Sequence, residues 1–234
     1  GGGSGNKIVY VTESSSMSTY ETFYYSWLQS QASTHGWVVS TTTWASNPTW
    51  SSYDLIVISV DSSTTYNRYS SIKTQILDQK MRLMLVNRLA DELVERLSLG
   101  RDANHGYGNF KYNYVVGNYA GITTGYSGMT YLTSGGTATG GSIERYTAFN
   151  GQDLASYYSG DTSELVWAVW DKTDSYNSQS PAYYSGNLNT RVGFYGQSFY
   201  ASSSGTPTAQ TSWNTMMGKT VNWLLEGTGS SGGS

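Results

Sequence analysis

Four polar side chains follow hydrophobic segments of the sequence, at the positions where open α/β sheets bind their ligands. Glu13 follows the first segment, Asp61 the third, and Asn87 and Arg88 the fourth. Because the carboxyl ends of parallel strands lie along one edge of a sheet, we expect these side chains to converge on one rim. Two carboxylates beside an arginine can bind a sugar or another polar ligand. Equally, they can form an ion pair only, such as Glu13 with Arg88.

Two histidines are the only candidates for an imidazole base. His105 lies in the polar loop at residues 102–106, just past an expected helix, and is the better candidate for a site residue. His35 precedes Gly36 at a helix end, where a capping role is expected. Between the two termini the sequence has no Gly-x-Ser-x-Gly turn of the serine hydrolases. A hydrolase that uses His105 or a carboxylate pair is therefore the third of three hypotheses.

Metal and cofactor sites have little support in the sequence. Two isolated histidines and no cysteine do not make a zinc ligand set. Acidic residues between Asp161 and Asp174 leave calcium open, but their spacing matches no EF-hand loop. Residues 12–18 lack the glycines of a phosphate-binding loop. We predict no metal and no cofactor.

The composition favours an extracellular or cell-surface protein. Charged residues make up only 12% of the chain, about half of the usual share. The 36 serines and 27 threonines must supply much of the polar surface. The net charge of −3 provides no basic face for nucleic acid. No apolar run reaches the roughly 20 residues of a membrane span, so we expect none.

The hydrophobic pattern predicts a parallel α/β sheet in the first half of the chain and short strands in the second. Strands are expected at residues 7–12, 37–43, 53–59 and 82–87, with helices around residues 17–35, 66–79 and 89–97. Short strands are expected at residues 112–117, 129–133, 142–149, 164–170 and 190–195, before a final helix at 210–225. We expect a single α/β domain over residues 6–226, between flexible Gly/Ser linkers at 1–5 and 227–234.

Four phrases and the order of the elements resemble the class I glutamine amidotransferase-like superfamily. The phrases are YDLIVIS at residues 53–59, GITTGYSG at 121–128, NTRVGFYG at 189–196 and GKTVNWLLEG at 218–227. The resemblance extends from about Asn6 to Gly227 and is nearest to a non-catalytic extracellular branch, often carbohydrate-associated. It implies a flavodoxin-like three-layer sandwich with a mostly parallel sheet and extra β-strands in the second half.

The chain departs from this superfamily at its catalytic positions. Catalytic members place a cysteine on the sharp turn after a strand, which corresponds here to residues 86–89, Val-Asn-Arg-Leu. Their histidine follows a late strand, which corresponds to residues 196–198, Gly-Gln-Ser. Neither position holds the required residue, so amidotransferase and cysteine hydrolase activity are not expected.

Three functions remain as hypotheses. The first is a non-catalytic extracellular or cell-surface module of a larger protein, structural or self-associating, whose partners are other copies or neighbouring surface proteins. Adjacent aromatic pairs such as Tyr24-Tyr25 and Tyr157-Tyr158 suggest exposed tyrosines for such contacts. The second is a carbohydrate-binding or carbohydrate-processing domain that uses the rim, with glycans as partners. The third is the atypical hydrolase.

Overall fold

The structure is a computed structural model that describes residues 5–104, 113–128, 130–131, 133–134, 136–145, 149–177, 184–201, 208–209 and 211–226. Its strands are β1 (Asn6–Thr12), β2 (Trp37–Thr43), β3 (Leu55–Ser59), β4 (Leu83–Val86), β5 (Asp102–Asn104), β6 (Asn113–Val115), β7 (Thr130–Tyr131), β8 (Thr133–Ser134), β9 (Gly136–Gly140), β10 (Ser142–Glu144), β11 (Gln152–Tyr158), β12 (Asp161–Trp170), β13 (Val192–Tyr195), β14 (Gln197–Ala201) and β15 (Thr208–Ala209). Its helices are α1 (Thr19–His35), α2 (Ser63–Tyr66), α3 (Tyr69–Ile72), the π-helix η3 (Lys73–Leu77), α4 (Ala90–Arg96) and α5 (Thr211–Leu225), with short 3₁₀ turns η1 (Trp44–Ser46) and η2 (Trp50–Ser52).

Within the described residues, eleven strands form one mixed sheet. Along its main path the order is β2-β1-β3-β4-β13-β12-β11-β6-β7, and β10 and β5 join it through β12. The first five strands of this path are parallel, in the order of a flavodoxin-like sheet, and the strands beyond β13 are antiparallel. The predicted fold class is confirmed, including the extra β-strands from the second half.

The central strands are hydrophobic throughout because both faces of the sheet are covered. All five residues of β3 and all four of β4 are buried, as expected for parallel strands between two layers of helices. The first helix begins at a capping box between Ser18 and Glu21. It ends at Gly36, whose left-handed conformation (φ 71°) lets its N–H bond the carbonyl of Ala32.

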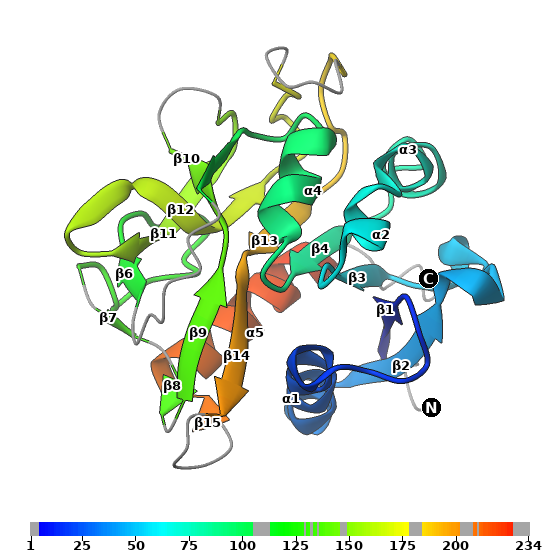
Figure 1. The fold of residues 1–234 in the computed structure, drawn as a ribbon, viewed down its shortest axis with the longest axis horizontal. Coiled ribbons are helices and arrows are strands. Elements are labelled where there is room, and N and C mark those ends of the chain that lie inside the picture. The colour runs from blue at the N-terminus through cyan, green and yellow to red at the C-terminus, as the bar shows by residue number, and fades with distance from the viewer. Residues whose placement is uncertain are drawn as a thin grey trace, which may run out of the picture.

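Two hydrophobic layers lie on opposite faces of the sheet. Alternate residues of β1 divide between them: Ile8 and Tyr10 belong to the layer under α1 and α5, while Val9 and Val11 belong to the layer under α2, α3, η3 and α4. Figure 1 shows this sandwich, with α4, α2 and α3 on one side of the sheet and α5 on the other. No helix of the described part is long and apolar enough to cross a membrane.

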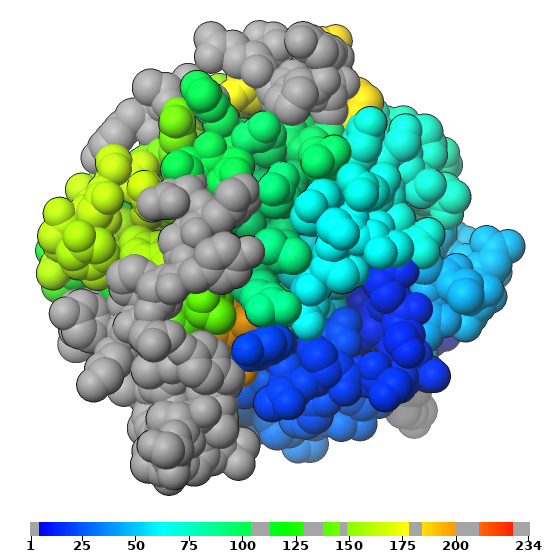
Figure 2. Space-filling model, viewed as in Figure 1, coloured from blue at the N-terminus to red at the C-terminus, as the bar shows by residue number. Residues whose placement is uncertain are grey.

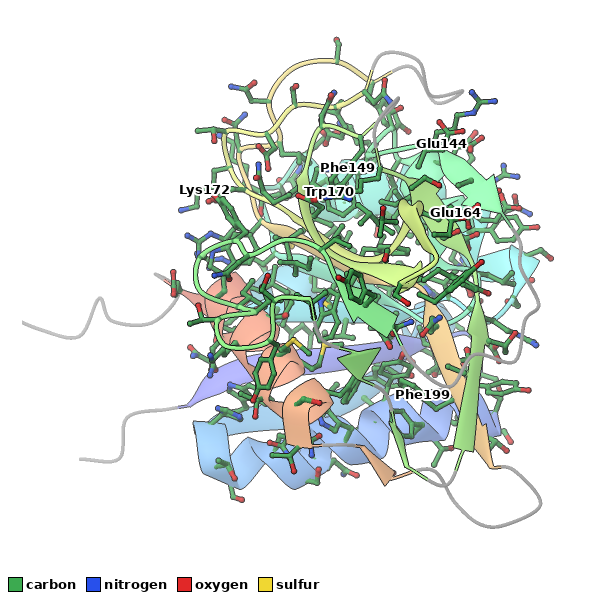
Figure 3. All side chains as sticks on the ribbon, turned by 90° about the vertical axis from the view of Figure 1, so that its left-hand side faces the viewer. Glu144, Phe149, Glu164, Trp170, Lys172 and Phe199 are labelled. Atoms are coloured by element: carbon green, nitrogen blue, oxygen red, sulfur yellow. The ribbon has the colours of Figure 1, made fainter. Side chains whose placement is uncertain are left out.

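Aromatic rings fill the layer under α1 and α5. Trp213 of α5 is fully buried and lies 5.3 Å from Trp27, 5.4 Å from Phe199 and 5.8 Å from Tyr195, measured between ring centroids. Phe199 stands on β14, which pairs with β9 in a separate two-stranded ribbon. In Figure 3 Phe199 lies near α1, far from the pair of Phe149 and Trp170. The contact between Phe199 and Trp213 therefore attaches the β9–β14 ribbon to the sandwich.

Several expected elements differ in the structure. The helix expected at residues 66–79 is present over residues 69–77, as α3 followed directly by η3, and a separate short helix, α2, precedes it. The segment is rich in Ser, Thr, Tyr and Asn, which are weak helix formers. The strand expected at 142–149 ends at Glu144, and the one expected at 164–170 begins earlier, at Asp161, in a hairpin with β11. Strands β9, β11 and β14 were not expected. The sequence of β9, GTATG, is typical of turns, and β11 and β14, QDLASYY and QSFYA, show no regular alternation of apolar and polar residues.

Replacing Trp213 by alanine tests the aromatic layer. We expect Trp213→Ala to lower the free energy of unfolding by about 3–5 kcal/mol, because it leaves a cavity among several rings. Chemical denaturation followed by far-UV circular dichroism measures this loss. Lys219→Ala, on an exposed position of the same helix, serves as the control and should change stability by less than about 0.5 kcal/mol. Equal effects of the two substitutions would contradict this packing.

Candidate functional site at the carboxyl ends of the parallel strands

The charged side chains at the carboxyl ends of the parallel strands form two ion pairs. Strand order reverses between β1 and β3, which is where ligands bind in open α/β sheets. Glu13 follows β1 and Asp61 follows β3, so both stand at this reversal. Figure 2 shows the segments that carry these residues, blue and cyan, bordering each other and the green segment of α4 on one face.

The first ion pair joins Glu13 to Arg68, between α2 and α3. The guanidinium group donates from Nε and Nη2 to the two carboxylate oxygens at 2.7 and 2.8 Å, which is the bidentate geometry of a strong pair. These hydrogen bonds raise the pKa of Arg68. Its guanidinium carbon also lies 5.4 Å from the centre of the Trp44 ring. The expected pairing of Glu13 with Arg88 is therefore wrong, because Arg68 binds both carboxylate oxygens of Glu13. The sequence pattern does not place Arg68 at the rim.

The second ion pair joins Asp61 to Arg88. Arg88 Nε donates to Asp61 Oδ1 at 2.8 Å, and the other oxygen of Asp61 accepts a hydrogen bond from Ser18 Oγ at 2.8 Å. The Arg88 guanidinium stacks over the ring of Tyr20, 4.9 Å from its centre. Since Ser18 also caps α1, this carboxylate connects the end of β3 to the start of α1.

Asn87 occupies a strained turn between β4 and α4. Its φ of 83° is uncommon for a residue other than glycine, and its side chain is fully buried. The amide nitrogen donates to Ser59 Oγ at 2.7 Å, and Ser198 Oγ donates to the amide oxygen at 2.8 Å. The backbone N–H of Arg88 completes the network by donating to Ser198 Oγ at 3.0 Å. Asn87 therefore points into the protein and is not available to a ligand.

Of the five predicted site residues, the structure joins Asp61 to Arg88, pairs Glu13 with Arg68 and buries Asn87. His105 lies outside the described residues. Sequence reasoning missed Arg68, Ser18 and Tyr20, which belong to segments read as ordinary helix. The remaining histidine, His35, stacks on Trp37 at 4.5 Å and contacts Asn222 at 3.0 Å. It therefore packs between α1, β2 and α5, beside the helix cap that the sequence predicted.

A second group of acidic side chains includes Asp91 of α4 and Asp102 of β5. Asp91 of α4 is fully buried, and a methyl group on Gly141 would collide with its carboxylate, so only glycine permits this approach. Burial raises the pKa of Asp91 well above the ordinary range, and the neighbouring Asp102 raises it further. In Figure 3 Glu144 and Glu164 lie near each other on paired strands. Within the described ranges, no three His, Cys, Asp or Glu residues are placed to hold a metal ion.

The buried Asp91 predicts a specific pH dependence of stability. An acid with a higher pKa in the folded state binds more protons there, so stability falls as the pH rises above about 4, the ordinary carboxyl value. We expect Asp91→Asn to remove much of this fall and to make the protein more stable than wild type at neutral pH. Unfolding free energies measured across the pH range test this. Glu226→Gln, which removes an exposed carboxylate, is the control; parallel profiles of wild type and Asp91→Asn would contradict the assignment.

Comparison with known proteins identifies the fold. No protein-family model and no curated protein sequence matches the chain. Among solved structures, a ThuA-like protein from Parabacteroides merdae ATCC 43184 superposes with a TM-score of 0.51 at 12% identity, over 95% of this chain and 90% of that chain. A ThuA-like protein from Bacteroides uniformis ATCC 8492 gives a TM-score of 0.48 at 10% identity, over 95% and 91%. The chain therefore shares a flavodoxin-like α/β fold with the Parabacteroides merdae protein.

Proposed function

We propose that the chain is a non-catalytic module of an extracellular or cell-surface protein, with a structural or self-associating role. The observation that carries this proposal is the hydrogen bond between Asn87 and Ser198. The resemblance places the superfamily's cysteine at the turn that holds Asn87 and its histidine at the segment that holds Ser198. The two segments do meet in space, but an amide and a hydroxyl occupy the contact.

The chemistry of this contact supports a structural role. An amide side chain is a poor nucleophile and does not ionise near neutral pH. The Ser198 hydroxyl donates to Asn87 and accepts from the backbone of Arg88, so its hydrogen-bonding groups are engaged within the protein. Both side chains are fully buried. The turn at Asn87 is left-handed (φ 83°), and the hydrogen bonds of its side chain fix the backbone there.

The composition supports the extracellular part of the proposal. A chain with 12% charged residues and no cysteine relies on hydroxyl and amide groups for its polar surface. The four rim charges are matched two by two across Glu13–Arg68 and Asp61–Arg88. The rim therefore carries no net charge from these groups that would attract an ionic substrate.

Activity measurements test the non-catalytic proposal. We expect the purified protein to show no turnover above background with glutamine, ester and glycoside substrates. Asn87→Ala and Ser198→Ala should leave that background unchanged while lowering thermal stability, because each leaves buried partners without a hydrogen bond. Turnover by the wild type that either substitution abolishes in a folded protein would overturn the proposal.

A second candidate function, carbohydrate binding at the rim, has a specific observation in its favour. Tyr20 and Trp44 flank the two ion pairs, each beside a guanidinium group. Sugars bind where a ring provides an apolar face and charged groups provide hydrogen bonds to hydroxyls. The rim offers both within one group of side chains.

Glycan binding is measurable by array screening followed by calorimetry on any positive sugar. Where a sugar binds, we expect Tyr20→Ala to weaken the affinity by up to about tenfold, since an aromatic contact contributes about 0.5–1.5 kcal/mol. Tyr158→Ala, at an exposed tyrosine of β11, should have no effect. No binding to any glycan, or equal loss in both variants, would reject the rim as the sugar site.

A further inference from the structure

One edge of the main sheet is formed by a long strand. The seven residues of β2 pair in parallel with β1, and within the described part of the chain no strand pairs with the other side of β2. Figure 1 shows β2 at this end of the sheet, next to α1. Since a strand directs its backbone N–H and C=O groups to alternate sides, the outer edge of β2 presents donors and acceptors to another strand.

This edge lacks the features that usually prevent strands from pairing between molecules. Such features are charged side chains, proline, a bulge or a very short strand. The sequence of β2, WVVSTTT, contains neither charge nor proline, and its register with β1 has no irregularity. At about 3.3 Å per residue it spans about 23 Å. The opposite end of the main path, β7, has only two residues.

The side chains of β2 also fit a strand partner. Val38 is 52% exposed, one of two large hydrophobic residues with high exposure among those described. The other is Tyr158, so the described tyrosines do not form the exposed aromatic face that the sequence suggested. Valine and threonine favour cross-strand contacts because their branched side chains pack well on a pleated surface.

We propose that β2 pairs with β2 of a second copy of this chain, antiparallel about a two-fold axis, so that two sheets become one. Charge favours this partner: a two-fold contact brings each side chain close to its own counterparts, where any charge would meet a like charge. The strand carries no charge, so a two-fold contact of β2 with its own copy meets no like-charge repulsion. This inference rests on the self-associating role proposed above and assigns it a surface.

The size of the contact sets its strength. A single strand pair is smaller than the interfaces of about 1,200–2,000 Å² that hold stable complexes. The dimer is therefore weak and forms at high concentration. Such a contact is effective where many copies are held close together, as on a cell surface.

Light scattering coupled to size exclusion over a concentration series tests the proposal. We expect wild type to approach the mass of a dimer as concentration rises, and the double variant Val38→Lys/Ser40→Lys, which places both charges on one face of β2, to remain a monomer. Mixing it with Val38→Glu/Ser40→Glu should restore a dimer, because opposite charges then lie on the same face of the two paired strands. Thr173→Lys, an equally conservative charge addition in an exposed turn, should dimerise like wild type.

Hydrogen exchange on the wild type gives an independent readout that needs no substitution. Amides of β2 should become more protected as concentration rises, while amides of η2 should not change. A wild type that stays monomeric at its solubility limit, or a dimer that persists in the lysine variant, would overturn the assignment of β2. Both results concern association and say nothing about turnover. A failure of the β2 surface can therefore be told apart from a failure of the non-catalytic proposal, which the activity measurements test.

Discussion

The rim depends on the buried amide of Asn87. Its two hydrogen bonds, to Ser59 and Ser198, hold a left-handed turn, a conformation that asparagine tolerates better than most residues other than glycine. The turn determines where α4 begins, and therefore directs Arg88 toward Asp61 and places Asp91 against Gly141. Because Ser198 comes from the second half of the chain, the same contact fixes the β9–β14 ribbon to the parallel sheet.

The low charge content has consequences at several places in the fold. With few charged groups available, those at the rim join elements distant in sequence: Glu13 reaches Arg68, and Asp61 reaches both Arg88 and the cap of α1. Partly exposed ion pairs contribute little stability individually, so their main effect is to fix the positions of the loops. The edge strand β2 remains uncharged, and its hydroxyl-rich surface keeps hydrogen-bonding groups open to partners.

The sequence predicted the parallel half of the fold well because its strands are buried on both faces. Segments such as β3 and β4 are hydrophobic runs bounded by polar residues, and their ends locate the rim residues Glu13, Asp61 and Asn87. It could not predict how these residues pair. Glu13 pairs with Arg68, which lies in the short break between α2 and α3 that the sequence pattern does not mark. The strand β9, GTATG, has no hydrophobic pattern and β14 is short, so the contact of Asn87 with Ser198 was not predicted.

A strained turn costs free energy, and it persists only where the surrounding structure compensates for it. In a catalytic protein the compensation would serve to present a nucleophile to the substrate. Here the strain brings Asn87 into a buried hydrogen-bond network with Ser59 and Ser198, and the result is a rigid junction between the two halves of the chain. The geometry of the turn supports a structural role without any reactive group, because the direction that it imposes on α4 is needed to assemble the rim. Under the non-catalytic proposal, fold and chemistry are separable in this protein, because the turn at Asn87 positions α4 without a reactive side chain.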